Sequence, residues 1–139
     1  MGNAKLIVLV DDNYADNEYH QYVIADADAD ANVKVIDDSR DALQYLANCF
    51  VSGNGEFPVP DLIFLDINMP AMNGFELLDK LKQLPDPRGY RKAIKIFMLT
   101  GSLNPDDQQR AVGTYGDIVS GYRIKPLTVE MLREIDEGK

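Results

Sequence analysis

The sequence has few residues of several kinds, and each scarcity excludes a class of protein. Cys49 is its only cysteine, so no internal disulfide can form, and a small buried thiol in a reducing compartment is the simplest interpretation. No apolar run approaches the roughly 20 residues that a helix needs to cross a bilayer. The first apolar run, 6–10, is also too short for a signal peptide. We therefore expect a cytoplasmic protein with no membrane partner.

Positive charge is scarce too, with 14 Lys and Arg residues against 23 Asp and Glu residues and a net charge of -9. Proteins that bind nucleic acid need a basic stripe to replace the counterions of the phosphates. The one basic run, 88–92, is short, and we interpret it as a solvated loop. No nucleic-acid partner is expected.

Apolar runs and helical patterns alternate five times along the chain. Strands are expected at about 5–10, 33–36, 62–65, 94–99 and 118–124, each followed by a helix. Near-continuous apolar strands between helices indicate a parallel sheet that is covered on both faces. We expect an α/β fold, a doubly wound (βα)5 flavodoxin-like three-layer sandwich whose parallel five-stranded sheet has the order 2-1-3-4-5.

The helical patterns predict which residues are buried and where helices begin. In the first helix the expected buried stripe is Ala15, Tyr19, Tyr22 and Val23. The segment 26–31 lacks such a stripe and should be a loop, and Ser39 should cap the second helix. The helix that begins at Asn104-Pro105 has few apolar residues and an internal Gly113, so we expect it to be weakly anchored.

Polar side chains stand at or just beyond the ends of four predicted strands. They are Asp11, Asp12, Asp66, Thr100 and Lys125. The carboxyl ends of parallel strands meet at one edge, so these groups should converge there. Three carboxylates together need a counter-charge, and Mg²⁺ prefers such oxygen ligands. The Asp66 carboxylate could take a phosphoryl group, whose oxygens Lys125 and Thr100 would then contact.

These residues and their neighbours resemble the receiver domain of two-component response regulators. The matching stretches, spread over essentially the whole chain, are Val10–Asp12, Phe64–Gly74, Leu99–Gly101 and Tyr122–Pro126. The resemblance implies that Asp66 takes a phosphoryl group from a partner histidine kinase or phosphotransfer protein. It also implies that Asp12, Asp66 and the Asn68 backbone carbonyl bind Mg²⁺ directly, while Asp11 acts mainly through water.

The resemblance further implies a conformational switch. Thr100 would be the switch hydroxyl and Tyr122 the switch aromatic, whose inward rotamer phosphorylation would favour. The surface formed by 103–124 and the helix that begins at Thr128 would then carry the signal to an unknown protein target. We also expect a cis Lys125-Pro126 bond, and a single receiver domain over 1–139 with no output domain.

Other functions fit these residues less well. A receiver-like module that docks without phosphorylation is the main alternative, although the intact set of polar residues argues against it. A phosphohydrolase would need a second acid where Asn68 stands, and a flavodoxin-like carrier would not place two aspartates beside a flavin phosphate. We expect no enzymatic activity beyond Mg²⁺-dependent self-phosphorylation and slow self-dephosphorylation. His20, the sole histidine, should be an ordinary helix-surface or interface residue.

Overall fold

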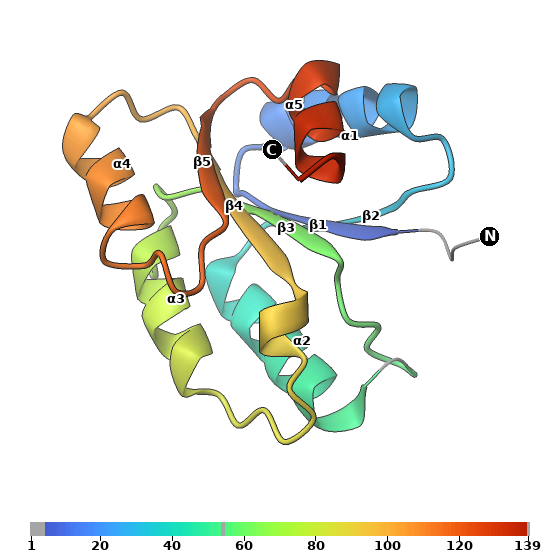
Figure 1. The fold of residues 1–139 in the computed structure, drawn as a ribbon, viewed down its shortest axis with the longest axis vertical. Coiled ribbons are helices and arrows are strands. Elements are labelled where there is room, and N and C mark those ends of the chain that lie inside the picture. The colour runs from blue at the N-terminus through green and yellow to red at the C-terminus, as the bar shows by residue number, and fades with distance from the viewer. Residues whose placement is uncertain (1–4, 54, 139) are drawn as a thin grey trace.

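The computed structural model describes residues 5–53 and 55–138, in which a parallel sheet lies between two layers of helices (Figure 1). The strands are β1 (Leu6–Val10), β2 (Asn32–Ile36), β3 (Leu62–Leu65), β4 (Lys95–Thr100) and β5 (Gly121–Ile124). They take the order β2-β1-β3-β4-β5, and every neighbouring pair is parallel. The predicted fold class and strand order are confirmed.

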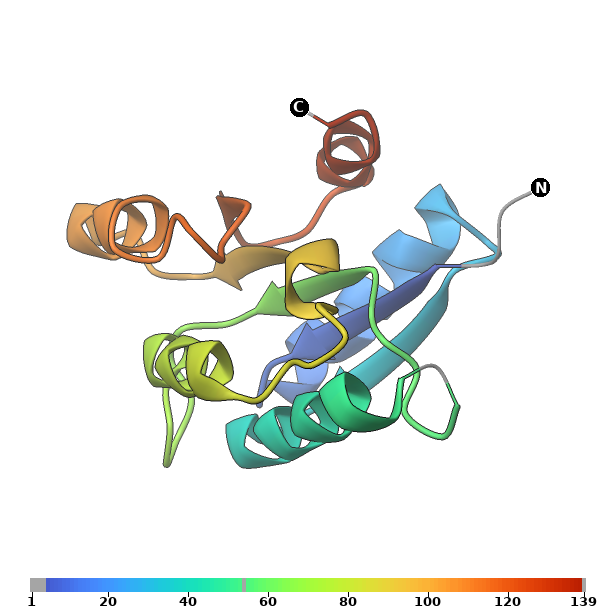
Figure 2. The ribbon, with the colours of Figure 1, turned by 60° about the horizontal axis from the view of Figure 1, so that its bottom comes forward.

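Helices cover both faces of the sheet. They are α1 (Tyr14–Ala27), α2 (Ser39–Ser52), α3 (Gly74–Gln83), α4 (Pro105–Val112) and α5 (Val129–Asp136), with a 3-10 turn, η1, at Arg91–Ala93. Ile24 of α1 and Leu132 of α5 belong to one buried cluster, and Phe50 of α2 and Phe75 of α3 belong to the other. Figure 2 shows α5 on one side of the sheet and α2 and α3 on the opposite side. Because the strands carry apolar side chains on both faces, each cluster includes strand residues as well as helix residues.

The register of the sheet brings the carboxyl ends of the central strands to one edge. Val10 of β1 pairs with Leu65 of β3, and Leu65 pairs with Met98 of β4. The residues that follow Val10 and Leu65 therefore leave the sheet side by side. This is the edge at which we expected the polar residues that follow the strands.

The buried face of α1 differs from the predicted one. Tyr19 and Tyr22 are exposed, by 53% and 76%, whereas Asn17, His20 and Ile24 are buried. A tyrosine keeps its hydroxyl wet at little cost, and buried polar side chains are tolerated where they are hydrogen-bonded. Apolar spacing alone therefore selected the wrong face, and the prediction of a surface position for His20 was wrong.

Several element ends also differ from expectation. Asp38, not Ser39, caps α2 by accepting a hydrogen bond from the Arg40 backbone N–H at 2.8 Å. The Ser39 hydroxyl is buried instead and donates to the Met72 carbonyl at 2.6 Å. The loop after α1 begins only at Asp28, and β5 begins at Gly121. These shifts leave the position of the polar edge unchanged.

The remaining predictions on helices and spans agree with the structure. Asn104 caps α4, and Ala111 is the one buried residue of this eight-residue helix. Cys49 is fully buried in the core beside α2's other apolar residues. Over residues 5–53 and 55–138, no helix is long and apolar enough to cross a membrane.

Candidate functional site

Three carboxylates meet at the carboxyl edge of the sheet. Asp11 and Asp12 follow β1, and Asp66 follows β3. One carboxylate oxygen of each residue lies within 4.8 Å of those of the other two. Asp11 and Asp66 are buried, with 5% and 7% of their surface exposed, whereas Asp12 is exposed. The predicted convergence of these three residues is confirmed.

Backbone hydrogen bonds orient the two buried carboxylates. The Asn13 N–H donates to Asp11 Oδ1 at 2.9 Å, and the Ile67 N–H donates to Asp66 Oδ1 at 2.8 Å. The Asp66 N–H also donates to the Val10 carbonyl at 3.0 Å, which ties the two strand ends together. One oxygen of each carboxylate is therefore held by the backbone, and the second, Oδ2, faces Lys125.

The Lys125 ammonium lies among three carboxylates. Its Nζ is 2.7 Å from Asp11 Oδ2, 2.7 Å from Asp16 Oδ2 and 3.3 Å from Asp66 Oδ2. Burial opposes its charge, but the hydrogen bonds to Asp11 and Asp16 outweigh that cost and raise the pKa of Lys125. Burial likewise raises the pKa of Asp11, although the bonds from Lys125 and Asn13 act in the opposite direction. Lys125-Pro126 is a cis peptide bond, as predicted.

Asp16 was missed by the sequence analysis. It lies in the first turn of α1, which Asn13 caps by accepting the Asp16 N–H at 2.9 Å. A helix that starts directly after β1 begins at the polar edge of the sheet, so an acid in its first turn can reach the site. That position was the available signal, and Asp16 contributes a further carboxylate to Lys125.

The loop from Asp66 to α3 is closely fitted to the site. The Gly74 N–H donates to the Ile67 carbonyl at 2.8 Å. A Cβ at Gly74 would lie 2.4 Å from the Asp66 carbonyl oxygen, so no side chain fits there. Ala71 has a left-handed φ of 68°, and the Met72 N–H bonds the Pro70 carbonyl at 2.7 Å. Asn68 is exposed in this loop, and the role of its carbonyl as a metal ligand stays a prediction.

Thr100 and Tyr122 form a second group beside the carboxylates. Thr100 is completely buried, and its Oγ1 accepts the Ser102 N–H at 3.2 Å. The Tyr122 hydroxyl donates to the Ser102 carbonyl at 3.3 Å, and Ser102 Oγ donates to Asp107 of α4 at 2.5 Å. Tyr122 is only 7% exposed, and a change of its rotamer on phosphorylation stays a prediction. Ser102 thus connects Thr100, Tyr122 and α4.

The chemistry of the donor set fits a divalent cation. The Lys125 ammonium contacts the carboxylates of Asp11, Asp16 and Asp66, and Asp12 adds a fourth carboxylate beside Asp11 and Asp66. The group therefore carries excess negative charge, and all its free ligands are oxygen atoms. Oxygen-only ligands with few carboxylates are typical of sites that take Mg²⁺ or a similar ion.

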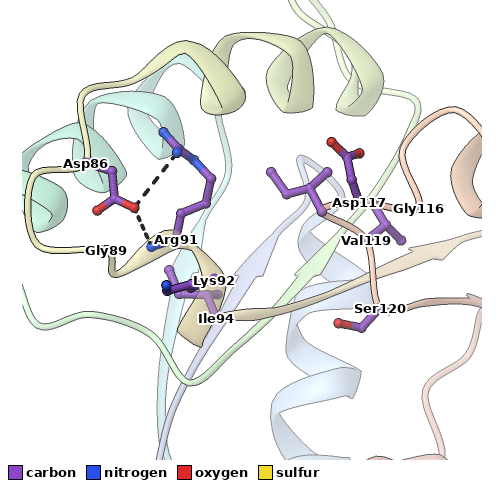
Figure 3. A pocket seen from close by; sticks show the side chains of 10 residues that line it. Asp86, Gly89, Arg91, Lys92, Ile94, Gly116, Asp117, Val119 and Ser120 are labelled. Carbon is purple, nitrogen blue, oxygen red and sulfur yellow. Dashed lines mark hydrogen bonds and ion pairs between the residues drawn. The ribbon is translucent and has the colours of Figure 1, made fainter.

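A cavity of about 620 Å³ lies away from this cluster, before the amino ends of β4 and β5 (Figure 3). Asp86, Arg91 and Asp117 are among its lining residues. The interpretation of 88–92 as a solvated loop does not hold for Arg91. Its guanidinium donates to the Leu81 and Leu84 carbonyls and lies 3.8 Å from Asp86. These contacts close the α3–β4 connection, so we assign Arg91 a structural role.

Known proteins resemble this chain over nearly its whole length. The family model of the response regulator receiver domain matches residues 7–135. Response regulator Rcp1 from Synechocystis sp. is 34% identical over 137 residues, which cover 96% of this chain and 85% of Rcp1. A crystal structure of the Mn²⁺-bound form of Rcp1 has a TM-score of 0.67 and 32% identity, covering 96% of this chain and 90% of that chain.

Two further structures extend the comparison. A two-component response regulator from Cytophaga hutchinsonii has a TM-score of 0.82 and 27% identity, covering 99% of this chain and 97% of that chain. The phosphorylated cyanobacterial phytochrome response regulator RcpA has a TM-score of 0.69 and 31% identity, covering 97% of this chain and 90% of that chain.

Proposed function

Because this chain belongs to the response regulator receiver domain family, it is a phosphoacceptor signalling module, and we propose that Asp66 is its acceptor. One observation carries the assignment. The Asp66 carboxylate is held by the backbone on one oxygen, lies among two further carboxylates and has the Lys125 ammonium 3.3 Å from its other oxygen. Positioning and charge neutralisation of this kind are what phosphoryl transfer requires.

The proposed reaction is a transfer from a phosphohistidine on a histidine kinase or phosphotransfer protein. An Asp66 carboxylate oxygen attacks phosphorus, the P–N bond breaks, and the imidazole leaves with that electron pair. The product is an acyl phosphate on Asp66. Lys125 neutralises charge on the phosphoryl oxygens, and the Thr100 hydroxyl donates to one of them. Later attack by water releases phosphate slowly, and we propose no other enzymatic activity.

We propose that the ion is Mg²⁺, because oxygen ligands with few carboxylates suit it. The Mn²⁺-bound structure of the relative Rcp1 supports a divalent metal more generally. Asp11, Asp12 and Asp66 would hold it, Asp11 mainly through water, with the Asn68 carbonyl as a further ligand. The ion supplies positive charge beside the transferring phosphoryl oxygens. Lys125 would supply positive charge from a second direction.

The proposed signal runs through Ser102. When Thr100 turns its hydroxyl towards a phosphoryl group, the Ser102 N–H loses the acceptor that it has at 3.2 Å. Ser102 also bonds the Tyr122 hydroxyl and Asp107 of α4, so its displacement alters both contacts. A local change of charge thereby biases the α4–β5–α5 face towards another shape, which a downstream protein recognises.

Intact-mass measurement after incubation with acetyl phosphate tests the assignment. Wild-type protein should gain one phosphoryl group with Mg²⁺ and none after EDTA treatment. Asp66→Asn should gain none, whereas Asp79→Asn, an exposed acid on α3, should behave as wild type. Uptake by Asp66→Asn at the wild-type rate would overturn the assignment. Absence of uptake by wild type would favour a module that docks without phosphorylation.

A further inference from the structure

His20 is buried next to the proposed acceptor site, although nothing in the transfer reaction uses it. It is 2% exposed, and its Nε2 accepts the Leu127 backbone N–H at 3.3 Å. Leu127 is also fully buried and stands two residues beyond Lys125. The hydrogen bond therefore joins α1 to the segment that carries the site's cation.

His20 is one of three residues by which α1 holds the site. Asp16 bonds the Lys125 ammonium at 2.7 Å, and Asn17 Nδ2 donates to the Asp11 carbonyl at 2.8 Å. Asn17 and His20 line a small cavity of about 10 Å³ together with Asp11 and Asp66. His20 thus lines the same cavity as the two buried aspartates, on the helix whose Asn17 bonds the Asp11 carbonyl.

We propose that His20 is a positioning residue for Lys125, because it anchors the 125–127 segment to α1 and thereby keeps the ammonium among Asp11, Asp16 and Asp66. This inference rests on the proposed function of that site. In this role His20 contacts neither the phosphoryl group nor the carboxylates that would bind the metal. It acts through the backbone of Leu127.

The chemistry of the contact favours this assignment over simple filling of the core. Burial lowers the pKa of His20, so the ring is neutral and Nε2 keeps the lone pair that accepts the Leu127 N–H. An apolar side chain would fill the same space but leave that buried N–H without an acceptor. The segment would then seek a partner elsewhere, and Lys125 would move with it.

Substitution separates the positioning role from packing. His20→Leu should lower the maximal rate of phosphorylation by acetyl phosphate about tenfold, since small misplacements of a catalytic group are costly. Its Mg²⁺ affinity should not fall, because a displaced Lys125 ammonium competes less for Asp11 and Asp66. His20→Gln supplies an acceptor at a similar reach and should recover most of the rate. Ile24→Ala, one turn further along the buried face, should lower stability and leave the rate unchanged in the folded protein.

Nitrogen-15 NMR gives a readout that does not depend on phosphorylation. His20 is the only histidine, so its ring nitrogens give a single assignable set of signals. We expect an unprotonated Nε2 and a hydrogen-bonded Leu127 amide in wild type. A protonated Nε2 at neutral pH would overturn the proposal even if His20→Leu failed to fold. So would equal phosphorylation rates in wild type and folded His20→Leu. If wild type took up no phosphoryl group but showed the expected NMR signals, the proposed function would fail and the anchoring contact would stand.

Discussion

The carboxylate cluster around Asp11 and Asp66 and the region around α4 are built differently. Around Asp11 and Asp66, each buried carboxylate has one oxygen fixed by a backbone N–H and the other facing Lys125. Around α4, by contrast, a helix of eight residues buries only Ala111. The helix before it in the chain, α3, buries five of its ten residues.

This contrast separates two physical tasks. Charge stabilisation works best when the groups are already in place, because they need no reorganisation during transfer. A segment that changes shape must instead come from the least stable part of a fold. We infer that the carboxylate end is the fixed half and α4 the adjustable half, with Ser102 between them.

The strongest test of the fixed half is Lys125→Ala. We expect phosphorylation by acetyl phosphate to slow by about 10²-fold, since a preorganised charge of this kind is worth that much in other transfers. Mg²⁺ should bind more tightly, because no ammonium then competes for Asp11 and Asp66. Stopped-flow rates and calorimetry would measure the two effects, with exposed Lys80→Ala as control. Slower transfer combined with weaker Mg²⁺ binding would contradict the assigned arrangement.

Asp12→Asn tests the metal part of the fixed half. Asp12 is exposed, so the fold should persist while Mg²⁺ affinity falls roughly tenfold or more, as losses around metal sites do. Calorimetric titration measures it. Asp37→Asn removes another exposed acid that follows a strand at the same edge, and its affinity should match wild type. Equal affinities for Asp12→Asn and wild type would remove Asp12 from the site.

Amide hydrogen exchange with beryllofluoride, a phosphoryl mimic, tests the adjustable half. We expect several-fold changes in exchange across 103–124 and little change in α2 and α3, because the mimic draws Thr100 away from Ser102. Ser102→Ala, which removes the bond to Asp107, should shrink the response in α4. Changes centred on α2 while the mimic is bound would show that the adjustable half lies elsewhere.

The smallest expected effect is a pH dependence of stability from His20. Burial lowers its pKa below the ordinary 6.5, so the unfolded chain takes up protons before the folded protein does. Its stabilising contribution is present above pH 6.5 and is lost as pH falls below it, until the folded ring is itself protonated. The slope is at most about 1.4 kcal/mol per pH unit. Chemical denaturation at several pH values should show a steeper loss for wild type than for His20→Gln.

The sequence predicts the site better than the helix that supports it. Asp11, Asp66 and Lys125 could be placed because each comes directly after a strand, and parallel strands end at a common edge. The buried face of α1 could not be predicted, because the side chains of Asn17 and His20 are hydrogen-bonded to residues outside this helix, Asp11 and Leu127. The same dependence on tertiary contacts explains the missed role of Asp16. Sequence spacing reports local structure, whereas these contacts join segments that are far apart.

Gly74 has a consequence for how this protein can vary. The α3 backbone approaches the Asp66 carbonyl so closely that a methyl group at Gly74 has no room, and the Gly74 N–H closes the loop on Ile67. The stretch from 66 to 74 is therefore a closed loop of fixed length. An added residue in this loop would push α3 away from the acceptor. A graft of the acceptor into another scaffold must carry the whole loop, Gly74 included.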